Sequence, residues 1–202
     1  MPTINVNKSP DISIGMPVYN GENYICEAIN SVLNQTYQNF ELIISDNAST
    51  DRTQEICIAY AERDARIKYF RQRENCGAHL NFIFVAMKAE GNLFTWLAHD
   101  DILLPEFLFE AVNYMLARPA VTLVTGDFKI IGSDGVEKGI EKLETIRGHL
   151  PWTSRRLKFF RYPISNVYFC IYGVMRSAAC RSALQTVPLP RLLGGSEGAN
   201  SK

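Results

Sequence analysis

Leu93-Phe94-Thr95-Trp96-Leu97-Ala98-His99-Asp100-Asp101 is an apolar run that stops abruptly at two adjacent acids. A run of this length indicates a core strand, and in an open α/β sheet ligands gather at the carboxyl ends of the strands. The two neighbouring carboxylates repel each other, so a cation, a basic partner or solvent must compensate them. A divalent ion shared with substrate phosphates would do so. The alternative is a solvated helix cap, with Asp101 opening the helix that begins near Pro105.

The composition of the 202 residues is that of an ordinary globular protein, with 47% hydrophobic and 21% charged residues. The length suits one domain with a substantial core. Lysine plus arginine equals aspartate plus glutamate, at 21 each, so no net charge attracts a nucleic acid and we expect no such partner. The five cysteines include no C-x-x-C pair, which argues against a zinc site or a disulfide framework and favours a reducing cytosol.

The two ends of the chain carry different signals. Residues 1–10 are polar and lack the apolar segment of a signal peptide, so we predict a disordered tail. No apolar stretch reaches the roughly 20 residues of a transmembrane helix. We therefore expect a cytoplasmic protein without a transmembrane segment, and peripheral attachment at the inner membrane face stays open. The mostly small and polar residues 193–202 predict that the chain is incomplete at its C-terminus.

Strand-like and helix-like segments alternate along the first two thirds of the chain. Apolar runs predict strands at 12–19, 40–45, 67–70, 93–100 and 121–125, and helical periodicity predicts helices at 22–33, 56–60, 80–88 and 105–117. This alternation implies a mostly parallel sheet flanked by helices. Beyond residue 126 the pattern is less regular, and it predicts a hairpin from 128, a helix at 152–160, a strand at 167–175 and a helix at 177–185.

Polar clusters follow four of the predicted strands. They are Tyr19–Glu22, Asp46–Asp51, Asn75–Gly77 and His99–Asp101. Because the carboxyl ends of parallel strands meet at one edge of a sheet, we expect the four clusters to border one cleft.

Several motifs in this chain are similar to those of one enzyme family. They are Met16–Glu22, Gln35-Thr36-Tyr37, Glu41–Asp51, Asn75-x-Gly77, Asn81, the Asp100-Asp101 pair and Pro105-Glu106-Phe107. In this order they resemble the family 2 glycosyltransferases over residues 11–135. The resemblance implies the GT-A fold, which is Rossmann-like with a mostly parallel sheet. It implies one domain over 11–202, with a nucleotide-sugar-binding half at 11–126 and an acceptor-side half at 127–202.

The implied reaction is an inverting transfer of a sugar from a nucleoside-diphosphate donor to a hydroxyl of a saccharide or lipid-linked acceptor, as in polysaccharide biosynthesis. The resemblance implies that the donor is bound by Pro17, Val18, Tyr19, Glu22, Asp46, Asn75, Gly77, His99 and Asp100. Asp46 would accept the imide N–H of uracil or thymine, because a carboxylate only accepts hydrogen bonds, and this favours a UDP- or dTDP-sugar. The alternative for Asp46 is a cap of the following helix, a role that we also expect for Asp51.

Catalysis would fall to the acid pair and to a base. Mg²⁺ or Mn²⁺ held by Asp100 and Asp101 would neutralise the charge that grows on the leaving nucleoside diphosphate. The family's Asp-x-Asp has Ala98 at its first position here, so the acid that usually contacts the ribose or a metal-bound water is absent, while Asp100 matches the direct metal ligand. Inversion needs a carboxylate that takes the proton of the acceptor hydroxyl, and Glu197 lies near the expected position.

Two other functions compete with sugar transfer. Ala98 and the isolated Glu197 fit a non-catalytic domain that binds nucleotide sugars without transferring them. A nucleotidyltransferase shares the α/β layout but carries a glycine-rich, basic phosphate loop near its first strand. Met16–Glu22 has no such loop.

Overall fold

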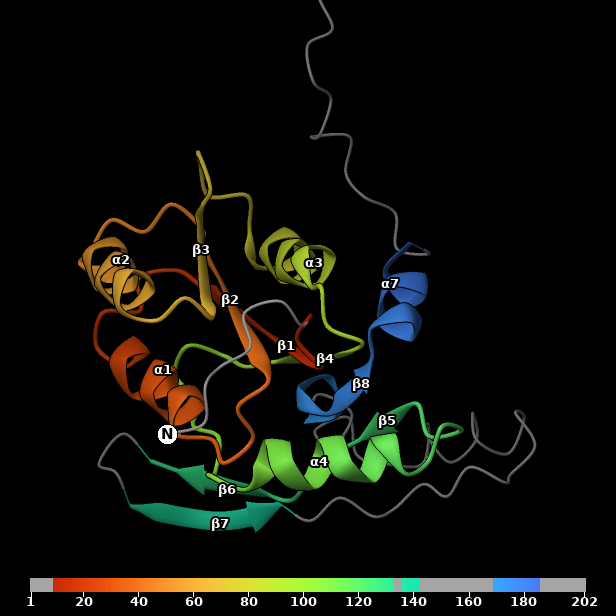
Figure 1. Cartoon of the computed structure of the whole chain (residues 1–202). Coiled ribbons are helices and arrows are strands. Elements are labelled where there is room, and N and C mark those ends of the chain that lie inside the picture. The colour runs from red at the N-terminus through yellow and green to blue at the C-terminus, as the bar shows by residue number, and fades with distance from the viewer. Residues whose placement is uncertain (1–8, 133–135, 142–168, 186–202) are drawn as a thin grey trace, which may run out of the picture.

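The computed structural model describes residues 9–132, 136–141 and 169–185 of the chain (Figure 1). Six strands form one sheet, in the order β3-β2-β1-β4-β8-β5. They are β1 (Ile12–Val18), β2 (Phe40–Asp46), β3 (Ile67–Arg71), β4 (Leu93–Trp96), β5 (Leu123–Val124) and β8 (Val174–Arg176). The first four strands run parallel, and β8 runs antiparallel to β4 and β5. The prediction of a mostly parallel sheet is confirmed.

Helices cover both faces of this sheet (Figure 1). Three of them, α1 (Ile25–Leu33), α2 (Thr53–Arg63) and α4 (Phe107–Leu116), contribute to the larger apolar cluster on one face. The other face carries α3 (Ala78–Lys88) and α7 (Ser177–Gln185). Every residue of β1, β2 and β4 is buried, which explains why these strands have near-continuous apolar sequences instead of alternating ones.

A glycine lets α3 pack closely on the middle of the sheet. A Cβ placed on Gly15 of β1 would lie 2.7 Å from Val85 Cγ2 and 2.9 Å from Phe94 Cζ. Any larger side chain at this position would push the helix away from the strand.

The glutamine of the Gln35-Thr36-Tyr37 motif holds the start of α4. The buried Gln35 side chain donates from Nε2 to the Leu104 carbonyl (2.8 Å) and accepts at Oε1 from the Leu108 N–H (3.0 Å). The Thr36 N–H donates to the Pro105 carbonyl (2.9 Å). Gln35 therefore satisfies one of the free N–H groups in the first turn of α4 and anchors the loop that follows β4.

Several element boundaries differ from the predicted ones. Helix α1 begins at Ile25 and not at residue 22, because the preceding residues are held in a loop by hydrogen bonds to the β2–α2 loop. The strand predicted at 167–175 is wrong over its first part: a 3-10 helix, η1 (Phe169–Tyr172), precedes the short β8. The Thr95 hydroxyl donates to the Tyr172 carbonyl (3.0 Å), so this carbonyl is bonded to a side chain and not to the backbone of a neighbouring strand.

The less regular half is described only in part. The predicted hairpin is confirmed as the antiparallel pair β6 (Phe128–Ile131) and β7 (Glu137–Glu141). The predicted helix at 152–160, most of the N-terminal tail (1–8) and Glu197 lie outside the described residues. No helix in the described ranges combines the length and the apolar character that crossing a bilayer requires.

Candidate active site

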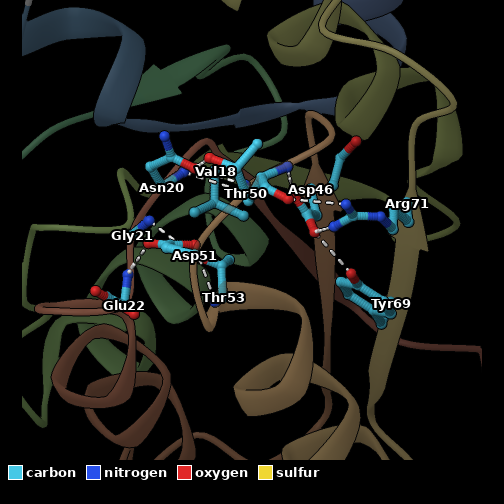
Figure 2. A network of polar contacts seen from close by, with 12 residues as sticks. Val18, Asn20, Gly21, Glu22, Asp46, Thr50, Asp51, Thr53, Tyr69 and Arg71 are labelled. Carbon is cyan, nitrogen blue, oxygen red and sulfur yellow. Dashed lines mark hydrogen bonds and ion pairs between the residues drawn. The ribbon is translucent and has the colours of Figure 1, made fainter.

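Two loops at the carboxyl edge of the sheet are joined by hydrogen bonds (Figure 2). Residues 19–24 follow β1 and residues 47–53 follow β2, and we call them the paired loops. Three backbone N–H groups of the first loop donate to side chains that follow β2: Asn20 to Ser49 (2.9 Å), Gly21 to Thr53 (2.8 Å) and Glu22 to Asp51 (3.0 Å). Two bonds run the other way, from the Thr50 N–H to the Asn20 side chain (2.8 Å) and from the Arg52 N–H to the Glu22 carboxylate (3.0 Å). These five hydrogen bonds hold the paired loops against each other.

Each paired loop contains a non-glycine residue with a left-handed backbone, Asn20 (φ 52°) and Ala48 (φ 60°). Alanine has no local hydrogen bond to offset the cost of this conformation, which is about 1–2 kcal/mol. Such backbone strain persists where the surrounding contacts over-determine the conformation, and this is common at ligand sites.

Asp46 ends β2 and is fully buried beneath the paired loops. Its Oδ1 accepts the Ser49 N–H (2.7 Å), and its Oδ2 accepts the Tyr69 hydroxyl (2.8 Å) and pairs with Arg71. Arg71 also donates to the Ser49 carbonyl (2.8 Å), and Figure 2 shows Tyr69 and Arg71 converging on Asp46. A base could reach this carboxylate only after Tyr69 or Arg71 moves, so the imide contact of Asp46 stays a prediction.

The contact between Tyr69 and Asp46 predicts a loss of stability in alkali. Burial, the hydrogen bond to Asp46 and the negative charge of Asp46 all raise the pKa of Tyr69. The unfolded chain loses this proton near pH 10 while the folded chain keeps it, so the free energy of unfolding should fall as the pH rises above about 10. Denaturant unfolding at pH 9 and pH 11 measures this fall, and it should be smaller in Tyr69→Phe. Equal falls in the two proteins would contradict the prediction.

Asn47 brings the loop after β3 to the paired loops. Its buried side chain donates to Asn75 Oδ1 (2.8 Å) and accepts the Cys76 N–H (2.9 Å). Asn75 Oδ1 also accepts the Gly77 N–H (2.9 Å), and Gly77 has a φ of 84° that favours glycine. Asn47 thus holds Asn75 and Gly77 next to the polar cluster Asp46–Asp51, a role that the sequence did not predict.

Asn81 of α3 fixes the ends of β1 and β2. Its Nδ2 donates to the carbonyls of Ser45 (2.9 Å) and Val18 (3.4 Å), and its Oδ1 accepts the Ser45 hydroxyl (2.6 Å). Asn81, one of the family motifs, therefore keeps the ends of β1 and β2 aligned beneath the site.

The acid pair lies in a turn after β4. The Asp101 N–H donates to the Ala98 carbonyl (3.2 Å), and we call residues 98–101 the acid turn. Asp100 and Asp101 are exposed. Desolvation by the surrounding protein raises the pKa of Asp101, and the charge of Asp100 raises it further. Burial raises the pKa of Tyr172, and so do the charges of Asp101 and Asp100, which places this phenol of η1 near the acid turn.

The acid pair fits a phosphate-bound divalent ion better than a metal site made of protein ligands alone. No cluster of three or more His, Cys, Asp or Glu side chains that could hold a metal occurs among the described residues. Mg²⁺ and Mn²⁺ bind hard oxygen ligands, and Mg²⁺ commonly uses one or two carboxylates together with water and substrate phosphates. Asp100 and Asp101 supply such oxygens, and no ion pair within the described ranges neutralises them.

The remaining predicted donor-binding residues differ in how they could reach a ligand. Pro17 and Val18 are buried in β1, and Val18 belongs to the main apolar cluster. Glu22 is exposed and bonded to the Arg52 N–H, so it has a structural role between the paired loops. Tyr19 is 45% exposed and leaves its ring open to solvent at the same edge.

An apolar pocket of about 350 Å³ adjoins this edge on the side of α3. Phe82 and Ile83 of α3 line it together with Trp96, Ile171 and Leu184, and exposed His79 lies at its rim.

Two solved structures share the fold of this chain. The chain superposes on Staphylococcus aureus TarS 1–349 with a TM-score of 0.63 and 21% identity, covering 92% of this chain and 52% of that one. The mannosyltransferase PcManGT of Pyrobaculum calidifontis, in complex with GDP-Man and Mn²⁺, gives a TM-score of 0.54 and 23% identity over 59% of this chain and 36% of that one. These similarities confirm the expected GT-A type of fold.

Sequence relatives extend the comparison. An uncharacterized glycosyltransferase of Rickettsia typhi is 42% identical over 53% of this chain and 32% of its own length, and one of Haemophilus influenzae is 35% identical over 69% and 58%. The putative teichuronic acid biosynthesis glycosyltransferase TuaG of Bacillus subtilis is 32% identical over 64% of this chain and 51% of its own length. The chain thus spans about a third to three fifths of these relatives. The family model "Glycosyl transferase family 2" matches residues 13–181, so the chain belongs to this family.

Proposed function

We propose that this chain transfers a sugar from a UDP- or dTDP-sugar to a hydroxyl of a saccharide or lipid-linked acceptor, with inversion and with the help of a divalent ion. The proposal rests on one observation above all. An exposed acid pair and the rigid paired loops follow neighbouring strands of a parallel sheet and meet at its carboxyl edge. This is the edge at which open α/β sheets bind their ligands.

The donor would lie with its base over the paired loops and its diphosphate near the acid turn. Tyr19 offers an exposed ring on which a base can stack, and Asn75 offers an amide fixed by Asn47. TarS 1–349 has been solved with UDP and with UDP-GlcNAc, which supports a uracil nucleotide as the donor for this chain. Asp46 would support the loops that bind the base, and it would accept the imide N–H if Arg71 or Tyr69 swings away.

Asp100 and Asp101 would hold Mg²⁺ or Mn²⁺, as the presence of Mn²⁺ in PcManGT supports. When bound there, such an ion would neutralise the charge that develops on the leaving nucleoside diphosphate. Glu197 stays the predicted base.

Two further observations support a pathway and a compartment. The name of TuaG supports an acceptor in polysaccharide biosynthesis. Cys26, Cys57, Cys76 and Cys180 are free thiols, which supports a reducing compartment such as the cytoplasm.

A thermal-shift series tests the proposed function. UDP-, dTDP- and GDP-sugars are added with Mn²⁺ or with EDTA, and the unfolding midpoint is measured. A UDP- or dTDP-sugar with Mn²⁺ should raise the midpoint by about 5 °C or more at a hundredfold excess over Kd. Release of UDP from the UDP-sugar should accompany this binding.

Two results would count against the proposal in different ways. If none of the nucleotide sugars shifts the midpoint, the chain has no donor site. If Mn²⁺-dependent binding is tight but no acceptor alcohol or saccharide supports the release of UDP, the non-catalytic binding domain is the better description.

A further inference from the structure

The ring of His99 occupies space that a side chain at position 21 would need. A Cβ placed on Gly21 would lie 2.6 Å from His99 Cδ2 and 3.3 Å from His99 Cγ. Real Cβ atoms do not approach other carbon atoms this closely, so only glycine lets the imidazole pack against this loop. His99 is half-buried, and its ring makes no hydrogen bond to the described residues. The ring therefore contacts Gly21 through van der Waals packing alone.

The surface against which His99 packs is itself fixed. The Gly21 N–H donates to the Thr53 hydroxyl (2.8 Å), and Gly21 is buried. Val18 Cγ2 lies 2.7 Å from the same Cβ position, so the glycine is enclosed by β1 as well as by the ring. The neighbouring residues of both paired loops are also bonded to each other (Figure 2), so the ring of His99 packs on a loop that hydrogen bonds hold in place.

His99 also belongs to the acid turn. It lies between Ala98 and Asp100, inside the turn that the Asp101 N–H closes on the Ala98 carbonyl. A ring held against Gly21 limits how this turn can rotate, and the next residue, Asp100, is the exposed carboxylate. The orientation of Asp100 is thus linked through two packed groups to the loops that follow β1 and β2.

We propose that His99 is a positioning residue: its ring, packed on Gly21, sets the direction in which the acid turn presents Asp100 to a metal-bound diphosphate. This inference rests on the proposed function, in which Asp100 is a metal ligand. It gives His99 a role through carbon contacts with Gly21, in place of the direct donor contact that the family resemblance implies. In metal sites generally, residues that do not touch the ion orient the side chains that do.

Three variants separate packing from ligation by a ring nitrogen. His99→Ala removes the ring, His99→Phe keeps a flat ring at the same place without nitrogen, and Gly21→Ala pushes the native ring away. UDP binding is measured by calorimetric titration in Mn²⁺ and in EDTA. We expect His99→Ala and Gly21→Ala to weaken the Mn²⁺-dependent binding of UDP about tenfold or more, and His99→Phe to stay within about threefold of wild type.

A structural defect is distinguished by a second readout. UDP binding in EDTA should stay close to wild type in all three variants, because only the metal-dependent part of the affinity depends on the direction of Asp100. The thermal midpoint should also stay close to wild type in the two His99 variants, whereas Gly21→Ala should lower it because its Cβ also meets Val18. Tyr114→Ala is the matched control, since it removes an exposed aromatic ring near the C-terminal end of α4. It should leave UDP binding unchanged.

The outcomes that overturn the inference differ from those that overturn the proposed function. Wild-type affinity in His99→Ala would show that the ring positions nothing. A loss in His99→Phe as large as in His99→Ala would show that a ring nitrogen is required and that packing alone is not the cause. If wild-type protein itself binds no UDP in Mn²⁺, the proposed function fails first.

Discussion

Asp100→Ala is expected to abolish the Mn²⁺-dependent binding of UDP. The substitution removes an exposed carboxylate at the carboxyl edge of the sheet, where a cation and a diphosphate would meet. A hard cation bound by few protein ligands loses much of its affinity with each carboxylate removed. We expect the affinity for UDP in Mn²⁺ to fall at least about 100-fold, which corresponds to about 2.7 kcal/mol. Calorimetric titration of UDP into the variant, with Mn²⁺ present, measures this loss.

Two further variants make the result specific to the site. Asp101→Asn keeps the shape of the neighbouring side chain and should weaken binding less, because Asp100 matches the direct metal ligand of the family. Glu62→Ala removes an exposed carboxylate from the last turn of α2, at the opposite edge of the sheet, and should change nothing. UDP binding in Asp100→Ala as tight as in wild type would remove the acid turn from the donor site.

The parallel core could be predicted from the sequence because its signals are local. The strands near residues 12, 40 and 93 are buried along their whole length, so each one is a near-continuous apolar run. The start of α1 could not be predicted in the same way. The residues around Glu22 favour a helix by their sequence pattern. In the structure, however, the Glu22 N–H donates to Asp51 and the Glu22 carboxylate accepts the Arg52 N–H, about 30 residues away. Long-range hydrogen bonds override local helix propensity there.

The sequence predicted which polar clusters form the candidate site, but not the contacts between their side chains. The acids were expected directly at the end of a strand over 93–100, but β4 ends at Trp96 and the acids follow four and five residues later, in the acid turn. The partners of Asp46 were not expected, although a signal exists: in the parallel pair of β2 and β3, Asp46 and Arg71 are register neighbours. The packing of His99 on Gly21 has no such signal, because it depends on the three-dimensional path of two loops.

Asp46→Ala is expected to destabilise the fold more than any other single carboxylate change considered for this chain. The side chain has no solvent exposure, and its removal leaves the Ser49 N–H, the Tyr69 hydroxyl and Arg71 without their acceptor. Breaking a buried charged pair costs about 3–5 kcal/mol, and because the Arg71 side chain is 32% exposed and can turn to water we expect about 3 kcal/mol. Denaturant unfolding measures the change in the free energy of unfolding.

The conservative variant shows which part of this loss is due to charge. Asp46→Asn keeps an oxygen for the Ser49 N–H but loses the charge opposite Arg71, so its cost should be about half as large. Glu55→Ala is the matched control, because it removes a carboxylate from the highly exposed pair with Arg52 and should leave the unfolding midpoint unchanged. A midpoint in Asp46→Ala equal to that of wild type would mean that Asp46 does not hold the paired loops to β3. The carboxylate would then be free to accept the imide N–H of a base.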